Sequence, residues 1–230
     1  MDLRLLITAL AAALLALPSQ AFQVRPVRVD LSARQATAQL VVGNPTDRVL
    51  LIQAQVWLWS QEAAQDRLEP ATDLIVNPPI FELAPGAQQV LRVGLRQSLP
   101  PGREQSWRLW LSQVPTPATP GDGGVQMLLR VSLPVFGVGD GAPDPAPRWL
   151  RADAGASVAL ANDGGRHVHV RELRLQSDGL PAQALGPCYA LPGGGCRWSL
   201  PREWQGRPLR LEADSDAGRL KARFDGPASP

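Results

Sequence analysis

After about two dozen residues, apolar and polar positions alternate along the chain in short runs that are separated by glycine, proline and other turn-forming residues. Alternation with a period of two places the apolar side chains on one face of a β-strand, whereas an amphipathic helix repeats at about 3.6 residues. Helical periodicity is almost absent from these runs. The pattern therefore predicts an all-β protein of sandwich type.

The runs fall into two groups along the chain. The first group predicts seven strands, a number typical of an immunoglobulin-like sandwich: 23–31, 37–43, 48–59, 73–77, 88–95, 106–114 and 125–136. The second group predicts a smaller sandwich with strands near 156–162, 167–176, 188–191, 196–200, 208–213 and 220–224.

A segment rich in glycine, aspartate and proline, GVGDGAPDPAP at 137–147, separates the two groups. Such a segment breaks strands and is typical of a short, semi-rigid linker. We therefore expect an immunoglobulin-like domain over 22–138, a linker over 139–147 and a second immunoglobulin-like domain over 148–230.

The N-terminus has the pattern of a secretory signal peptide over 1–21. An apolar run at 3–17 follows the first charges and leads to Pro18, Ser19 and Ala21, where small residues suit cleavage. The run is shorter than the roughly 20 apolar residues that span a membrane, and no later run reaches even this length. We expect the mature chain to begin near Phe22, without a membrane span, soluble and outside the cytoplasm.

The two cysteines, Cys188 and Cys196, flank a short segment with one proline and three consecutive glycines, which allows the chain to turn back. An oxidising compartment would join them in a disulfide. Metal ligation is the alternative, because His167 and His169 would share one face of a strand. No further ligands have zinc-site spacing, so we favour the disulfide and predict no metal.

Charge and composition exclude two function classes. The net charge is only +2, and the cations are 22 arginines spread along the chain and one lysine, Lys221. Nucleic-acid binders usually concentrate cations on one face with aromatic residues among them, so we predict no nucleic-acid partner. Both histidines lie in one short strand, and no nucleophile motif or glycine-rich phosphate loop occurs, so we predict neither an enzyme nor a cofactor.

The run at 125–136 has the strictest alternation in the chain. One face would carry six apolar residues, and Pro134 on the opposite face cannot donate to a ladder, which favours an edge strand. The six residues either line the core of their own domain or are lent to another protein by strand addition. An exposed edge also leaves self-association of the free protein open. The six are Val125, Met127, Leu129, Val131, Leu133 and Val135.

Four stretches together resemble the PapD-like periplasmic chaperones of bacterial chaperone–usher pili, in a divergent, non-classical form. The resemblance covers most of 22–137. It is carried by Pro26-Val27-Arg28-Val29, the stretch from Asn77-Pro78-Pro79 to Gly86, Arg103-Glu104 with the strand from Trp107 to Pro115, and Pro134-Val135-Phe136.

The resemblance implies two immunoglobulin-like domains in an L-shaped arrangement and a periplasmic protein. It implies that the last strand of the first domain completes unfinished pilus or fimbrial subunits, which the chaperone then delivers to an outer-membrane usher. The alternatives are a structural pilin or adhesin-like protein and an unrelated periplasmic binding protein with immunoglobulin-like domains.

The resemblance also implies a pair of cations that binds the subunit's C-terminal carboxylate. Arg28 matches the first cation, but Pro134 occupies the place of the second, a lysine. Arg130 on the same strand or Arg108 on its neighbour would replace it, with Arg130 slightly preferred. Glu104 matches an acid that sets the interdomain angle, although Val138 stands near the place of its usual arginine partner.

Overall fold

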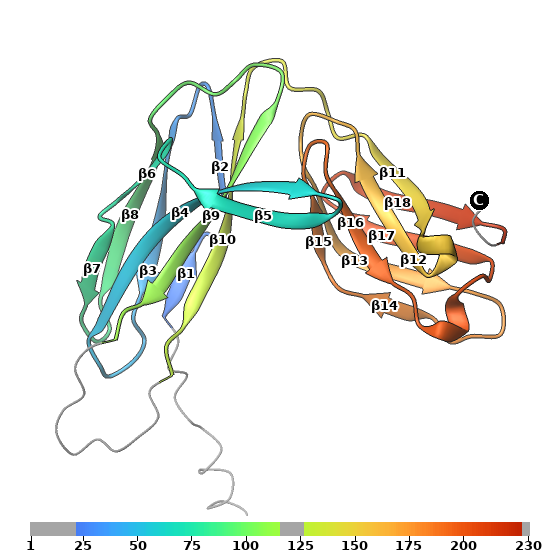
Figure 1. The fold of residues 1–230 in the computed structure, drawn as a ribbon. Helices are drawn as coiled ribbons and strands as arrows, with labels where there is room; N and C mark the ends of the chain where they lie inside the picture. The colour runs from blue at the N-terminus through green and yellow to red at the C-terminus, as the bar shows by residue number, and fades with distance from the viewer. Residues whose placement is uncertain (1–21, 116–126, 227–230) are drawn as a thin grey trace, which may run out of the picture.

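The computed structural model describes residues 22–115 and 127–226, so the predicted signal peptide lies outside the described residues. The described part is built of β-strands in two domains (Figure 1) and contains no α-helix. Two short 3₁₀ turns, Asp153–Gly155 and Arg202–Trp204, lie in the second domain. No helix in this part is long and apolar enough to cross a membrane. The predicted all-β fold with two sandwich domains is confirmed.

The first domain consists of two sheets that pack face to face. One has the strand order β1-β3-β8-β6, and the other has the order β2-β10-β9-β4-β5, with β7 paired to β4. The strands are β1 Gln23–Arg25, β2 Val29–Ser32, β3 Thr37–Gly43, β4 Leu50–Glu62, β5 Gln65–Pro70, β6 Leu74–Asn77, β7 Ile80–Leu83, β8 Gln88–Leu95, β9 Glu104–Gln113 and β10 Arg130–Val138.

The alternation in the sequence builds the core between these sheets. Leu91 and Val93 of β8 and Leu109 and Leu111 of β9 occupy every second position and are fully buried. Each such side chain contributes about 1.5–3 kcal/mol on burial. This repeated gain fixes which face of each strand points inward.

The predicted strand 23–31 is wrong as a single element, because the chain changes sheets within it. β1 ends at Arg25 and pairs with β3, whereas β2 begins at Val29 and runs parallel to β10. Pro26 has no amide hydrogen with which to continue a ladder, and its bond to Arg25 is cis. Arg28 is thereby held in the connection between the two sheets.

The strictly alternating run forms a strand that begins later than predicted. β10 covers Arg130–Val138, and residues 127–129 precede it without regular structure. β10 pairs with β9 along its whole length, but with β2 only over Val135–Val138. Among the described residues, its first half, Arg130–Pro134, therefore has a single neighbouring strand and forms an open edge.

The second domain repeats the two-sheet plan on a smaller scale. Its sheets have the orders β11-β12-β16 and β14-β13-β17-β18, with β15 paired to β13. The pattern had predicted no strand at β5, β7, β11 or β14, which are short or lack clear alternation. The strands are β11 Pro147–Ala152, β12 Ser157–Asn162, β13 Val168–Gln176, β14 Gln183–Leu185, β15 Cys188–Ala190, β16 Gly195–Ser199, β17 Leu209–Ser215 and β18 Gly218–Phe224.

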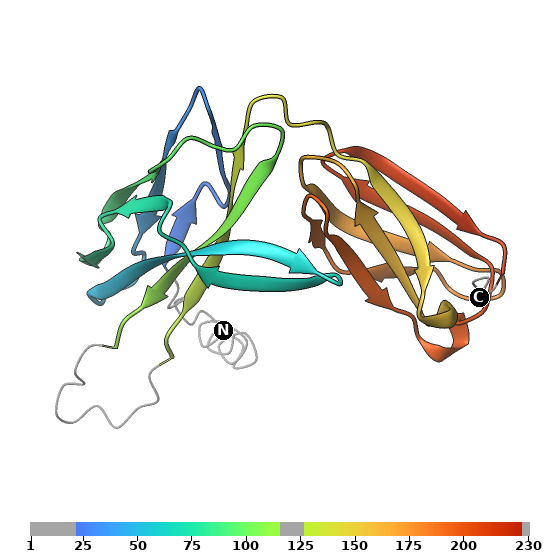
Figure 2. The same cartoon turned by 45° about the horizontal axis from the view of Figure 1, so that its top comes forward.

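The two domains form an L, joined at one end by the segment that follows β10 (Figures 1 and 2). The hairpin of β4 and β5 projects from the first domain and reaches the second near β15 and β16. Ala63 and Ala64 at its tip both have positive φ, which a tight two-residue turn requires. The domains are thus connected by the chain and by this hairpin.

Candidate functional site

A group of apolar and aromatic side chains lies where the domains meet, and we call it the junction cluster: Trp59, Leu68, Phe136, Tyr189 and Leu191. Trp59 and Phe136 come from β4 and β10, whereas Tyr189 comes from β15 of the second domain. The ring centroid of Tyr189 lies 5.6 Å from that of Trp59 and 5.7 Å from that of Phe136. Aromatic contacts at these distances stabilise the interface beyond their buried area.

Two of the three predicted anchor arginines lie beside the junction cluster. The Arg28 guanidinium lies 5.2 Å from the Phe136 ring centroid, and that of Arg108 lies 3.6 Å from the Trp59 centroid. Arg108 also lies 5.5 Å from the Tyr189 centroid. The fold therefore brings Arg28 and Arg108 to the same set of rings, although 80 residues of sequence would otherwise separate them.

Arg108 stands directly opposite Pro134 in the register of β9 and β10. Residues paired in this way project from the same face of a sheet, so Arg108 lies beside the place where the resemblance implies a lysine. Within the described part of the chain, its guanidinium stacks on rings without forming a hydrogen bond or ion pair. Burial lowers its pKa, but an arginine stays charged in a protein.

Arg130 lies away from the junction cluster, at the beginning of β10. Its Nε donates a hydrogen bond of 2.9 Å to Ser112 Oγ, and its guanidinium lies 4.4 Å from the Trp110 ring centroid. Four residues separate it from Pro134, which is about 13 Å along a strand. The geometry therefore brings Arg108, rather than Arg130, to the junction cluster beside Arg28.

Arg28 is already paired with carboxylates from both domains. Its Nε donates to Asp30 Oδ1 at 2.8 Å, and its Nη1 lies 3.4 Å from Oδ2 of Asp216 in the turn between β17 and β18. Burial alone would lower the pKa of Arg28, but the two carboxylates outweigh this and raise it. About a third of its side chain stays exposed, so a further carboxylate can approach it.

Glu104, the predicted interdomain residue, bonds to a histidine that the sequence had suggested only as a metal ligand. Its Oε2 lies 2.8 Å from His167 Nδ1, and its Oε1 accepts a hydrogen bond from the His167 backbone amide. Both side chains are almost fully buried. The absence of an arginine at Val138 was the signal that Glu104 needed another partner.

The opposite side of the His167 ring faces Asp216. Nε2 lies 3.5 Å from Asp216 Oδ2, at the long limit of a polar contact, and has no nearer partner among the described residues. The ring also stacks on Phe136 with centroids 3.6 Å apart. His167 is therefore held between two carboxylates and an aromatic ring of the junction.

These contacts shift the titration of both groups. Burial would lower the pKa of His167, but the nearby Asp216 carboxylate and the hydrogen bond to Glu104 outweigh burial and raise the pKa above its ordinary value. Burial would raise the pKa of Asp216, but the nearby His167 ring and the hydrogen bond from the His169 amide lower it to about 2. The junction thus favours a charged pair.

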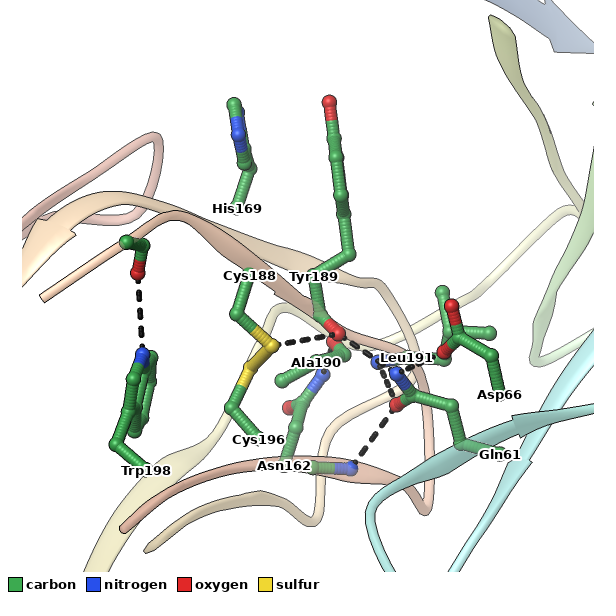
Figure 3. Close-up of a disulfide and its surroundings, with 12 residues drawn as sticks. Gln61, Asp66, Asn162, His169, Cys188, Tyr189, Ala190, Leu191, Cys196 and Trp198 are labelled. Carbon is green, nitrogen blue, oxygen red and sulfur yellow. Dashed lines mark hydrogen bonds between the residues drawn. A yellow bond between two sulfur atoms is a disulfide. The ribbon is translucent and has the colours of Figure 1, made fainter. Parts of the chain in front are cut away.

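Cys188 and Cys196 form the predicted disulfide, and it closes a loop that binds the β4–β5 hairpin (Figure 3). Gln61 Oε1 accepts hydrogen bonds of 3.0 Å from the amides of Leu191 and Gly195. Gln61 Nε2 donates to the Tyr189 carbonyl oxygen at 2.8 Å. One glutamine of the first domain therefore satisfies three backbone groups of the second.

The disulfide leaves no thiolate for a metal, and the part of the chain that the structure describes holds no cluster of three metal-ligating side chains. His169, the other candidate ligand, stacks on Tyr189 with centroids 4.0 Å apart. Figure 3 shows that both rings point away from the disulfide. His167 and His169 therefore take part in ring stacking and charge contacts at the junction.

Five of the six apolar residues of the alternating run lie in the described part of the chain, and they fall into three groups. Leu133 and Val135 are buried in the core of their own domain, so they offer no surface to a partner. Leu129 and Val131 are partly buried against that core, and Met127 is 75% exposed. Val125 lies outside the described residues. The apolar side chains available at the open edge are therefore those that precede Leu133.

Comparison with known protein families decides the class. The family described as pili and flagellar-assembly chaperones, PapD N-terminal domain, matches residues 21–141, which is more than half of the chain. The chain belongs to this family. The pilus chaperones are assembly proteins rather than enzymes, which confirms the prediction of no enzymatic activity. A search of curated proteins finds no match.

Solved structures of pilus chaperones have the same two-domain fold. One similar structure is a chain of the CsuC–CsuE chaperone–tip adhesion subunit pre-assembly complex, from the archaic chaperone–usher Csu pili of Acinetobacter baumannii. The TM-score is 0.69 and the sequence identity is 18%, and the alignment covers 89% of this chain and 98% of that chain. For the YadV chaperone the TM-score is 0.65 and the identity is 18%, with 88% of this chain and 99% of that chain covered. For the Pseudomonas aeruginosa CupB2 chaperone the TM-score is 0.58 and the identity is 20%, with 87% of this chain and 98% of that chain covered. The likeness therefore extends over both domains.

Proposed function

We propose that this pilus chaperone acts in the periplasm, where it holds pilus subunits by donating the open edge of β10 and delivers them to an outer-membrane usher. The observation that carries the proposal is the edge itself. Over Arg130–Pro134, β10 has a neighbour on one side only, and apolar side chains extend from it to the exposed Met127. Unpaired backbone groups and alternating apolar residues are what strand addition requires.

The proposal also assigns the subunit's C-terminal carboxylate to Arg28 and Arg108. Both flank the junction cluster, and Arg108 lies opposite Pro134, next to the donor segment. An arginine fork binds a carboxylate through two parallel hydrogen bonds, which fixes the register of the added strand. The donor side chains supply affinity, while the two arginines determine where the strand stops.

The test is the recovery of a co-expressed pilus subunit from periplasmic extract with the Met127→Glu variant. Because Met127 is 75% exposed, the variant should fold normally. Losing an apolar contact of about 1.5–3 kcal/mol should weaken capture roughly ten- to a hundredfold. Val90→Glu, at a half-exposed position of β8 in the other sheet, is the matched control and should retain capture. Equal recovery with both variants would refute the donor role.

A further inference from the structure

Four titratable side chains lie in a row across the junction, and the contact at each end of the row joins the two domains. Glu104 of the first domain contacts His167 of the second at 2.8 Å, and Asp216 of the second contacts Arg28 of the first at 3.4 Å. His167 and Asp216 are themselves 3.5 Å apart. The proposed anchor Arg28 is therefore at the end of a row that begins with a buried carboxylate.

Asp216 is shared between two cations when His167 is protonated. Its Oδ2 faces both Arg28 Nη1 and His167 Nε2, while its Oδ1 accepts a 2.8 Å hydrogen bond from the His169 amide. The backbone contact fixes the carboxylate in place. Its negative charge is then divided between the imidazolium and the guanidinium, which leaves Arg28 partly free to attract another carboxylate.

A neutral His167 cannot satisfy both neighbours. A neutral imidazole has one N–H, yet each of its nitrogens faces a carboxylate, so one carboxylate would meet a lone pair. Glu104 contacts the ring more closely and is more deeply buried, so it retains the N–H. Among the described residues, Asp216 is then paired with the cation of Arg28 alone, and it competes for Arg28 more strongly.

The other charged and titratable groups around the ring do not reverse this balance. Asp30 of β2 stays bonded to Arg28 in both states. Arg28 itself disfavours protonation of His167, but the two carboxylates outweigh it. The Tyr189 ring of β15 lies 5.8 Å from the His167 ring and stacks on His169, and Arg171 of β13 pairs with Asp214. The pKa of His169 is lowered, mainly by burial, although the nearby Asp216 opposes this shift.

We propose that Asp216 is a positioning residue that controls how freely Arg28 binds the subunit carboxylate, and that protonation of His167 releases Arg28, so that capture strengthens as the pH falls. The inference rests on the proposed function, because it needs a subunit carboxylate at Arg28. It gives Asp216 of the second domain a part in how Arg28 of the first domain binds the subunit carboxylate. A bound carboxylate would in turn favour the protonated histidine, because the two events are linked.

The experiment measures the affinity of the full-length chaperone for a purified pilus subunit from about pH 6 to about pH 8.5, a range that brackets histidine titration. The wild-type Kd should rise roughly fivefold across this range, as expected for one partly exposed ion pair. His167→Gln should remove the pH dependence and hold the weak, high-pH affinity. Asp216→Asn should also reduce the pH dependence, but hold the tight, low-pH affinity.

The opposite directions of the two variants separate positioning from a structural role, which would weaken binding in both. His169→Gln, two residues further along the chain in β13, is the matched control and should keep the wild-type pH profile. A pH-independent wild type, or a His167→Gln profile that still follows pH, overturns this inference. If Met127→Glu abolishes binding while the pH profile is flat, the inference alone fails. If no subunit binds at any pH, the proposed function fails with it.

Discussion

At the scale of single residues, the pairing of β9 with β10 places a cation opposite the position where the resemblance implies a lysine. Pro134 cannot supply a charge, and Arg108 projects from the same face directly opposite it. Stacking on Trp59 holds the guanidinium in place without using its hydrogen-bond donors. We propose that Arg108 takes the place of a cation at position 134 across the ladder, because paired residues share a face.

This exchange predicts a contrast between two arginines. Arg108→Ala should weaken subunit binding roughly tenfold or more, as expected when a charge-assisted hydrogen bond to a carboxylate is lost. Arg130→Ala should change binding less than about threefold, since Arg130 lies outside the junction. Arg108→Lys should restore part of the affinity by keeping the charge. A larger loss with Arg130→Ala in a binding titration would assign the anchor to Arg130 instead.

The sequence indicates Arg28 and Glu104 as candidate site residues and favours Arg130 slightly over Arg108, but it does not point to Asp216 or to the contact between His167 and Glu104. Arg28 and Glu104 lie in contiguous motifs, which can be read locally. The position of Arg108 depends on the register between β9 and β10, and the His167–Glu104 contact joins residues 63 positions apart. Such contacts depend on long-range pairing and domain docking, which no local pattern encodes.

At the scale of elements, the β4–β5 hairpin links the domains more specifically than the linker does. β4 is 13 residues long, so it extends beyond the sandwich and carries Gln61 to the loop that the disulfide closes. A Cβ at Gly194 would lie 2.4 Å from Gln61 Oε1, so the loop leaves room for this side chain only because a glycine is there. The hairpin and the loop are therefore complementary in shape.

Replacing Gln61 should test whether this side chain docks the hairpin onto the second domain. Gln61→Leu leaves the amides of Leu191 and Gly195 without their acceptor, so the free energy of unfolding should fall by about 2–3 kcal/mol. Denaturant unfolding monitored by tryptophan fluorescence measures it. Gln65→Leu, at an exposed position of the same hairpin, is the control and should change stability by less than about 0.5 kcal/mol. Similar values for both variants would contradict docking through Gln61.

At the scale of the whole molecule, the junction makes stability depend on pH in both directions. The pKa of His167 is raised above 6.5, so its stabilising contribution is complete below pH 6.5 and is lost as the pH rises through the raised value. The pKa of Asp216 is lowered from 3.8 to about 2, so its contribution is complete above pH 3.8 and is lost as the pH falls through about 2.

Thermal unfolding as a function of pH should therefore show a maximum between these limits. The Asp216 shift corresponds to roughly 2 kcal/mol, which solvent screening of this partly exposed carboxylate reduces to about 1 kcal/mol. His167→Gln should remove the alkaline decline, and Asp216→Asn should remove this part of the acid decline. A wild-type Tm that stays constant from about pH 6 to about pH 8.5 would show that the His167 contacts do not stabilise the junction.

The origin of the junction residues restricts how this chaperone can be recombined with its relatives. Glu104 and Arg28 belong to one half of the gene, and their counterparts His167 and Asp216 belong to the other. A chimera that fuses this first domain to a second domain without equivalents of His167 and Asp216 would leave Glu104 without this partner and the Phe136 ring without the imidazole that stacks on it. A foreign second domain must therefore supply both partners if the junction is to be kept, whatever the linker between the domains.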